Sequence, residues 1–366
     1  MTNLPPLASS HAWECNPLPT PLDYLNAPEF ADDQLTEAIN IPPYLTGRPA
    51  QLGIFTDTPI HTTYVRIGVS EQELTVIPAR ERGGESNLNI RGDARSGVSF
   101  DIPHFPLDDA ILPADIQNLT VWGEGDVIMA SLEDVYNDRL VALRAKHDFT
   151  HSHLDWGALN GIVLDGDGRE LLNVYDKFDL VEHSVEYDLA SSATRLAGLN
   201  RQVKAHVRRE LRGTPATGLR VLAGAKFFDM YVDHSNVREE LRDYKGSTAN
   251  PGRDDIQDVF EYAGLTLERI DEQYQVRQSN GTLVARDAVP EDEAIVVPLG
   301  TPFFKRYIAP PDTISGANRA PEAETKVFVS TDELPHGKGR EIHTESNVLP
   351  ICIRPQLLVR LRMKAA

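Results

Sequence analysis

Apolar residues are spaced most regularly between Asp126 and Leu154, where they recur every three or four positions. That period places them on one face of an α-helix and leaves the opposite face polar. Neither proline nor glycine occurs between Asp126 and Trp156, so nothing in this stretch interrupts a helix. The pattern predicts one helix over 126–154, about 43 Å long at ~1.5 Å per residue. We expect it to be a spine on which the other elements are assembled.

Alternating apolar and polar residues predict strands at 61–70, 71–79 and 96–105. A polar, glycine-rich segment separates the last two. An isolated hairpin is only marginally stable in water. A long hairpin with a polar tip therefore indicates that its partner surface lies on another molecule.

The remaining pattern is a mixture of strands and helices. A hairpin is predicted at 162–174, a second helix at 191–211, and further strands at 218–224, 260–270 and 293–300. Three more strands are predicted after residue 322. We expect these C-terminal strands to pair with the hairpin that follows the spine helix.

Residues 1–45 are rich in proline and have little periodicity. Only residues 28–40 form a helical pattern, which Pro28 would begin. Such a segment cannot bury enough apolar surface to fold alone. Its apolar side chains favour an arm that orders against a neighbouring subunit over the alternative, a disordered tail.

The charge balance disfavours proteins that wrap nucleic acid. The 366 residues carry 55 acidic and 36 basic side chains, a net charge of −19. Binding to phosphates requires a surplus of lysine and arginine, whereas an acidic wall can enclose nucleic acid without gripping it. No apolar run approaches the ~20 residues of a membrane span, and the N-terminus has no signal-peptide pattern. Two cysteines suggest free thiols and synthesis in the cytoplasm.

Basic residues are concentrated in the second half of the predicted helix 191–211. They are Arg201, Lys204, Arg208, Arg209 and Arg212. A solvated helix face is one interpretation of this cluster. The other is a patch that meets acidic neighbours or enclosed nucleic acid.

The histidines His147, His151 and His153 are the best metal candidates. Residues 147 and 151 lie on one helical face, as the ligands of HExxH sites do. The sequence is HDFTH, however, and no third ligand follows at a diagnostic spacing. The phosphate-binding, nucleophile-elbow and dinucleotide motifs are also absent. We therefore expect no catalytic residue, no metal and no cofactor, and keep a metal-dependent hydrolase using His147 and His151 as an alternative.

Several stretches stand out as a series along the chain. The main ones are QLGIF (51–55), LTVIPARERGG (74–84), FDIPHFPLDDAILPADIQ (100–117), RAKHD (144–148), GALNGIVLDGDGRELLNVYDKF (157–178) and ESNVLPICIRPQLLVRL (345–361). In this order they resemble the phage capsid E family, the major capsid proteins of lambda-like tailed bacteriophages. The resemblance spans roughly residues 45–366.

This resemblance implies the α+β major capsid fold of tailed phages and of the herpesvirus shell floor. Its parts would be an N-terminal arm (1–45), an extended β-hairpin loop (46–110), a peripheral domain with the spine helix 126–154, and an axial domain (213–321). The peripheral domain would comprise 111–212 and 322–366. Arg80, Arg82 and Arg95 in the extended loop are candidates for contact with acidic groups on a neighbouring subunit.

The resemblance also implies pentamers and hexamers that form the icosahedral head shell around double-stranded DNA. The protein would be assembled in the host cytoplasm and belong to the virion. It would meet a portal and a scaffolding protein, which we expect to be a separate chain because no long helical prefix precedes the arm. Some relatives crosslink through lysine, but basic positions of the loop hold arginine. We therefore expect reinforcement by a decoration protein at three-fold positions. An encapsulin-type compartment, which encloses proteins, is the alternative shell.

Overall fold

The computed structural model describes residues 30–44, 46–68, 97–117, 125–239, 259–277 and 281–364. Its helices are α2 (Asp32–Asn40), α3 (Arg48–Gln51), α4 (Pro113–Gln117), α5 (Gly125–Asn160), α6 (Val174–Phe178), α7 (Leu196–Leu211) and α8 (Ala225–Val232), with 3-10 turns η2 (Pro335–Gly337) and η3 (Pro355–Leu357). Its strands are β1 (Thr56–Pro59), β2 (Tyr64–Gly68), β3 (Gly97–Asp101), β4 (Phe105–Ile111), β5 (Ile162–Leu164), β6 (Glu170–Asn173), β7 (His183–Tyr187), β8 (Gly218–Gly224), β9 (Val259–Tyr262), β10 (Leu265–Ile270), β11 (Gln273–Arg277), β12 (Leu283–Asp287), β13 (Glu293–Leu299), β14 (Phe304–Ile308), β15 (Phe328–Glu333), β16 (Arg340–Ser346), β17 (Val348–Cys352) and β18 (Val359–Met363).

The predicted spine is confirmed as α5, which continues six residues beyond the predicted end, to Asn160. Gly157 lies inside the helix without ending it. A Cβ at this position would lie 3.0 Å from the carbonyl oxygen of Ile162, so glycine permits the close approach of the following hairpin. Gly161, with φ of 80°, then ends the helix in the left-handed conformation common at C-termini.

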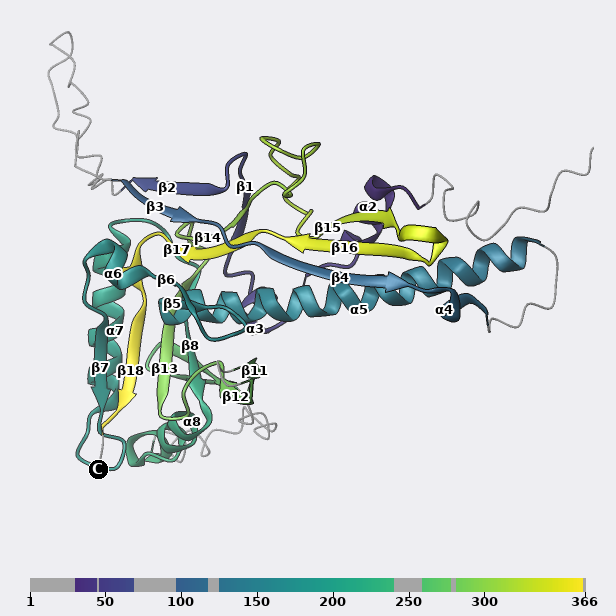
Figure 1. Cartoon of the computed structure of the whole chain (residues 1–366). Coiled ribbons are helices and arrows are strands. Elements are labelled where there is room, and N and C mark those ends of the chain that lie inside the picture. Colours follow the sequence, from purple (N-terminus) through teal and green to yellow (C-terminus); the bar gives the residue numbers. More distant parts are fainter. Residues whose placement is uncertain are drawn as a thin grey trace, which may run out of the picture.

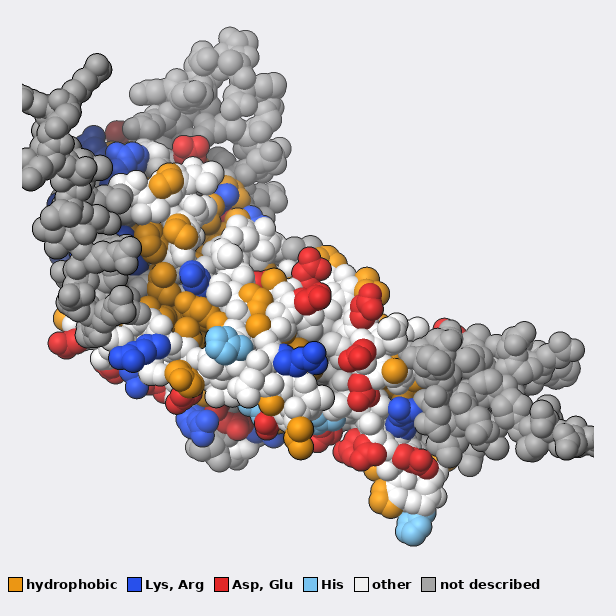
Figure 2. Space-filling model, turned by 90° about the horizontal axis from the view of Figure 1, so that it is seen from above, with side chains coloured by type: hydrophobic (Ala, Val, Ile, Leu, Met, Phe, Trp, Pro, Cys, Tyr) orange, Lys and Arg blue, Asp and Glu red, His pale blue; other side chains and the backbone are white. Residues whose placement is uncertain are grey.

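A three-stranded sheet, β15-β16-β4, lies along the spine α5 (Figure 1). Helix α2 packs against β15 of this sheet and also contacts α5. Its buried cluster joins Leu35 and Ile39 of α2 to Leu140 and Leu143 of α5, with Ile342 of β16. The part of the expected arm from residue 30 onward thus packs on its own subunit. Seen from above, acidic side chains gather over the half of the molecule that holds α2, β15 and β16 (Figure 2).

The prediction that the C-terminal strands pair with the hairpin after the spine is wrong. Strand β16 pairs with β4, from Arg340 opposite Ile111 to Ser346 opposite Phe105, while β5 and β6 form a separate two-stranded sheet. Pairing with β4 places Ile342 and Ile111 in the cluster against α5. The hairpin instead buries its apolar side chains beside the C-terminal end of the spine. The two apolar surfaces lie on different parts of α5, so each strand set packs separately.

At the other end of the spine stands a six-stranded sheet, β7-β18-β13-β8-β10-β9, nearly perpendicular to α5 in Figure 1. Helices α7 and α8 cover one face. Trp156 and Leu159 of α5 pack on the other, against Leu222 of β8. Because both faces are covered, β8 is apolar at almost every position rather than alternating. This explains why the strand predicted at 218–224 is largely apolar.

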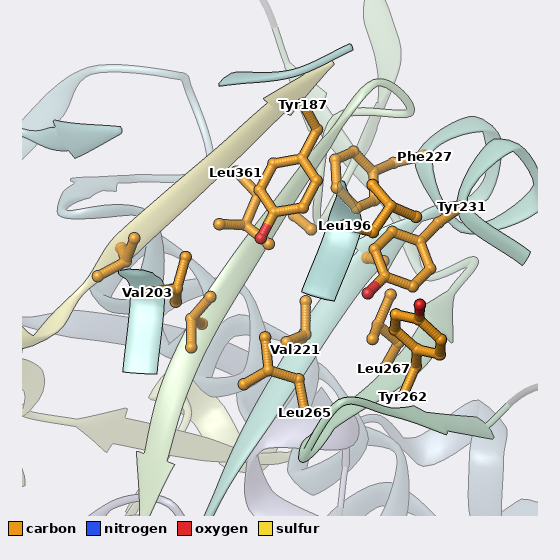
Figure 3. Packing of buried hydrophobic residues seen from close by; sticks show 14 of the residues in the cluster. Tyr187, Leu196, Val203, Val221, Phe227, Tyr231, Tyr262, Leu265, Leu267 and Leu361 are labelled. Atoms are coloured by element: carbon orange, nitrogen blue, oxygen red, sulfur yellow. The ribbon is translucent and has the colours of Figure 1, made fainter. Parts of the chain in front are cut away.

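The core between this sheet and its helices contains a buried polar centre. Figure 3 shows Tyr187, Tyr231 and Tyr262 among aliphatic side chains of the sheet (Figure 3). Asn200 of α7 is fully buried among them. It accepts a hydrogen bond from Tyr187 Oη (3.0 Å) and donates to Tyr231 Oη (2.7 Å) and to the Tyr262 carbonyl (3.1 Å). These bonds fix the position of α7 across strands that are distant in sequence.

Other sequence predictions differ from the structure in their boundaries. Helix α7 begins at Leu196 rather than at residue 191, since residues 191–194 form a turn closed by a bond from Thr194 N to Ser191 O. The strand region 260–270 is the hairpin β9–β10, which turns at Ala263 and Gly264 with positive φ. The predicted strands at 61–70 and 96–105 contain the antiparallel pair β2–β3. The predicted strand at 71–79 lies outside the described residues.

Helices and sheets thus combine in an α+β fold with the shape of an L (Figure 1). One limb of the L is the spine with its three-stranded sheet, and the other limb is the six-stranded sheet with α7 and α8. A third sheet, β1-β14-β17, lies beside the spine, and β17 contacts α5.

Candidate assembly surfaces and the charge clusters that support them

Arg306 and Asp155 form a buried ion pair at the centre of the subunit. Asp155 of α5 is fully buried, and the Arg306 side chain of β14 is 5% exposed. Tyr44, from the N-terminal segment, donates to the same Asp155 Oδ2 at 3.1 Å. The guanidinium of Arg306 also lies 4.8 Å from the centre of the Tyr44 ring. The cluster ties the segment before α3 to the spine and to the sheet beside it.

A second carboxylate continues this cluster toward the surface. Asp57 of β1 accepts from Arg306 at 2.8 Å and from Lys326 Nζ at 2.8 Å. Asp57 and Arg306 are direct partners in the parallel β1–β14 pair. The two carboxylates raise the pKa of Arg306 against the opposing effect of its burial. Arg306 is therefore a permanent cation at the junction of three elements.

Arg144 joins α2 to the spine. It donates to the Ile39 carbonyl (2.6 Å) at the C-terminal end of α2 and to Asp148 (2.7 Å) one turn further along α5. A cation at this end of a helix satisfies carbonyls that lack a partner within the helix. Asn40 Nδ2 donates to the Val327 carbonyl (2.6 Å), so α2 is also tied to the approach to β15.

The fold does not bring His147, His151 and His153 together as ligands of one metal ion. Thr344 donates its hydroxyl proton to the Leu107 carbonyl (2.8 Å), so its oxygen accepts from His147 Nε2 at 3.0 Å. His147 Nδ1 then accepts from Ser346 Oγ at 3.0 Å. Burial, followed by the charge of Arg144, lowers the pKa of His147 to about 4, in agreement with a neutral ring.

His151 is completely buried, and neither of its ring nitrogens has a hydrogen-bond partner among the described residues. Its ring and that of Tyr44 are arranged edge to face, with centroids 5.8 Å apart. Burial holds its pKa well below the ordinary value. His153 instead packs beside Tyr274. No group of three or more histidine, cysteine or acidic residues in the described ranges could hold a metal ion.

Glu272, between β10 and β11, connects the spine to α3 and to β11. It accepts from Trp156 Nε1 of α5 (2.7 Å), from the backbone N of Arg48 in α3 (2.7 Å) and from Tyr274 Oη (3.0 Å). The Arg48 side chain pairs in turn with buried Glu268 of β10. One carboxylate thus holds the corner of the L through three different elements.

Two arginines of β18 form a ladder with the strands on either side. Arg360 and Arg362 each pair with both Glu182 and Glu293, at 2.5–3.0 Å. Arg360 also donates to the Asn160 carbonyl at the C-terminal end of α5 (3.0 Å). Since β18 lies between β7 and β13, the ladder fastens the C-terminal strand into the sheet.

None of these clusters was predicted from the sequence. A usable signal was present for Arg306, a charge inside the apolar strand stretch FFKRYIAP, and for Asp155 between Leu154 and Trp156. Charges at apolar positions are rarely buried unless paired. Such a pattern predicts buried partners without identifying them.

The surface carries two charge patches of opposite sign. Exposed acidic residues of α2 and β15 form the first: Asp32, Asp33, Glu37, Asp332 and Glu333. The second is the outward face of α7, with exposed Arg201, Arg208, Arg209 and Arg212 and half-buried Lys204. Together the patches are sites at which copies of an acidic protein could meet.

The candidate contact residues Arg80, Arg82 and Arg95 lie outside the described residues. No helix within the described part of the chain is both long and apolar enough to span a membrane.

Comparison with solved structures identifies the fold. A capsid protein of a prophage of E. coli CFT073 superimposes with a TM-score of 0.51 over 91% of this chain and 99% of that chain, at 13% sequence identity. At this identity the likeness concerns the fold alone. The expected major capsid fold is thereby confirmed.

Comparison of sequences extends the likeness to named relatives. The major capsid protein of Salmonella phage Felix O1 (isolate Felix O1-VT1) is 23% identical over 355 residues, which cover 90% of this chain and 95% of that protein. The major capsid protein of Pseudomonas phage KPP10 is 25% identical over 353 residues, covering 91% and 96%. A compartment shell and a hydrolase are not favoured by these matches. Residues 33–363 match the model of the family phage major capsid protein E, and the chain therefore belongs to that family.

Proposed function

We propose that this chain is the coat subunit that forms pentamers and hexamers and closes into the icosahedral head shell of a tailed phage, around double-stranded DNA. The family match over residues 33–363 carries this proposal. As a member of a major capsid protein family, the protein is a virion component, and we assign it no catalytic role.

The charge clusters support a structural role. A shell subunit meets its neighbours at several slightly different angles, so its frame must stay rigid while its contacts adapt. Here Arg306, Glu272 and Arg360 hold the spine, the N-terminal segment and the C-terminal strand together at the corner of the L. Buried and bidentate pairs of this kind keep their geometry better than exposed ones.

We propose a division into functional parts along the chain. Residues 1–45 form the arm, 46–110 the extended loop, 111–212 with 322–366 the peripheral domain, and 213–321 the axial domain. Strands β7 and β18 complete the six-stranded sheet of the axial domain, so the two domains share this sheet. Arg80, Arg82 and Arg95 of the loop would contact acidic groups of a neighbouring subunit, for which Asp332 and Glu333 are candidates.

We further propose the partners that a head shell of this class uses. They are a separate scaffolding protein during assembly, a portal at one vertex, and a decoration protein at three-fold positions. The packaged DNA would be contacted without sequence specificity, as the net charge of −19 favours enclosure over tight binding.

Particle size tests the proposed function. The purified protein, with and without its scaffolding partner, is measured by light scattering and negative-stain microscopy. Closed shells, or rings of five and six, support the coat function, and DNA among the contents of native particles separates a phage head from a protein compartment. A stable monomer or dimer under every condition contradicts it.

A further inference from the structure

Helix α7 presents a basic face that the subunit itself does not neutralise. Arg201, Lys204 and Arg208 follow one another at intervals of three or four residues, so they form one row along the helix. Arg212 follows as the C-cap residue in the left-handed conformation. Arg209 lies beside this row. Within the described ranges, none of these five cations is in an ion pair, whereas Arg220, Arg306, Arg360 and Arg362 of the sheets are.

The helix dipole explains only part of this row. Cations are favoured in the last turn of a helix, which accounts for Arg208 and Arg209. That effect fades beyond one turn, and Arg201 and Lys204 lie further from the end. The one acidic residue of α7, Glu210, accepts a hydrogen bond from Arg354 at its backbone carbonyl (2.9 Å). It thus lies near a different cation.

A cavity of about 470 Å³ opens beside the row. Lys204 and Arg208 line it, with Thr214 and Thr217 of the loop after α7 and Gly218 at the start of β8. Among the described residues that line it, none is acidic. A Cβ at Gly218 would meet no atom within 4 Å, so the backbone borders open space. Two cations and two hydroxyls around a space of this size suit an incoming carboxylate.

Lys204 is positioned toward this cavity by the turn between β9 and β10. Its Nζ reaches the Ala263 carbonyl at 3.5 Å, and a Cβ at Gly264 would come within 2.3 Å of that nitrogen. Gly264 has φ of 75°, so the turn suits glycine for two reasons. The ammonium is held at the rim by a weak contact and retains two protons for a ligand.

We propose that the basic face of α7 and its cavity bind an acidic surface segment of a second copy of this chain. The inference deepens the shell assembly proposed above and rests on it. Each copy carries a net charge of −19, so copies repel one another at long range. Close packing in a shell then needs local contacts of opposite sign. The α7 face provides them on one side, and the surplus of acidic residues provides them on the other.

Charge reversal tests the contact. The variant Lys204→Glu/Arg208→Glu is compared with Arg319→Glu/Lys338→Glu, which changes the net charge equally at exposed positions away from α7. Assembly is followed by light scattering against protein concentration, without DNA, after circular dichroism has shown that the subunits are folded. We expect the α7 variant to need about tenfold more protein, or more, to form shells, since like charges facing across an interface are strongly unfavourable. The control should assemble like the wild type.

Crosslinking identifies the partner. Assembled particles made from a mixture of isotope-labelled and unlabelled copies are treated with a carbodiimide, which joins lysine to carboxylate. A peptide containing Lys204 joined to an acidic peptide of the other isotope supports the proposal. Lys204→Arg keeps the charge and should assemble normally without giving that product.

Other outcomes overturn the inference in distinct ways. Normal assembly of the α7 variant shows that the face does not meet a second copy. Normal assembly together with weaker DNA retention assigns the face to nucleic acid. An equal loss in variant and control shows that net charge alone governs assembly. If the wild type forms no shells or rings, the proposed function itself fails.

Discussion

Arg306 of β14 and Asp155 of α5 are separated by 151 positions in the sequence and form an ion pair in the interior of the subunit. Burial raises the pKa of Asp155, while the charge of Arg306 and the bond from Tyr44 oppose that rise. Asp57 and Tyr44 complete the cluster. The pair therefore joins the spine, a strand and the N-terminal segment at a point that water does not reach.

The first prediction concerns this pair. Arg306→Ala should lower the free energy of unfolding by about 3–5 kcal/mol, because it leaves Asp155 buried without its cation. Removing both charges, in Arg306→Met/Asp155→Leu, should recover stability to within about 2 kcal/mol of the wild type, since no isolated charge remains. Urea denaturation of unassembled subunits measures both. A double variant no more stable than Arg306→Ala would show that the packing of Arg306, and not its charge, is what matters.

The second prediction is a loss of stability in mild acid. His147 has a pKa of about 4 in the folded chain, whereas an unfolded histidine titrates near 6.5. The unfolded state therefore binds more protons between these values, and stability falls as the pH decreases through this window. From pH 7 to pH 5 this one group should cost about 2 kcal/mol. Denaturation midpoints across the range test this, and an unchanged midpoint down to pH 5 would contradict it.

A third prediction concerns His151, whose buried ring lacks hydrogen-bond partners among the described residues. His151→Leu should raise stability at pH 7 by about 1 kcal/mol, because an apolar side chain of similar size does not require desolvation of polar atoms. It should also reduce the acid sensitivity, as burial depresses the pKa of His151 too. His336→Gln, at an exposed position, is the matched control and should behave like the wild type. Destabilisation by His151→Leu would show that the ring makes a polar contact.

The fourth prediction compares the two glycines that bound β8. A Cβ at Gly224 would lie 2.1 Å from the Pro290 carbonyl oxygen, so Gly224→Ala must displace backbone. We expect a loss of about 1–3 kcal/mol, as for overpacked cores. Gly218→Ala adds a methyl group to open space and should be nearly neutral. The melting temperatures of the two variants, measured side by side, test this difference. Equal melting temperatures would contradict the close approach of the Pro290 carbonyl to Gly224.

The fifth prediction addresses the polar centre under α7. Asn200→Ala removes three buried hydrogen bonds, those of Asn200 to the Tyr187 hydroxyl, the Tyr231 hydroxyl and the Tyr262 carbonyl, and should cost about 3 kcal/mol or more. Tyr187→Phe removes one hydrogen bond and should cost about 1 kcal/mol. Calorimetry of the two variants tests this ranking. The argument does not hold if the asparagine variant is the milder of the two.

Local patterns accounted for much of the secondary structure. The spine, strands β8 and β13, the β5–β6 hairpin and helix α7 were all predicted within a few residues. Their apolar periods arise from neighbours within one or two turns, so a short stretch of sequence is sufficient to identify them. The errors lay at boundaries, such as the start of α7, where a turn competes with the helix.

The assembly of these elements was decided by tertiary structure. Strand β16 pairs with β4, over 200 positions earlier in the chain, and β18 inserts between β7 and β13. Apolar alternation identifies a strand and its buried face but not the strand beside it.

For the charge clusters and surfaces, too, some features follow from the sequence and others only from the tertiary structure. The sequence by itself determined the acidic balance, the basic residues of α7, the long helix and the family resemblance. Only the tertiary structure decided that Arg306 and Asp155 are buried together, that His147 is bonded to two hydroxyls, and that Lys204 and Arg208 of α7 line a cavity. The physical reason is that burial and electrostatic partners depend on distances between residues far apart in the chain, and these distances exist only after the sheets have packed on the spine.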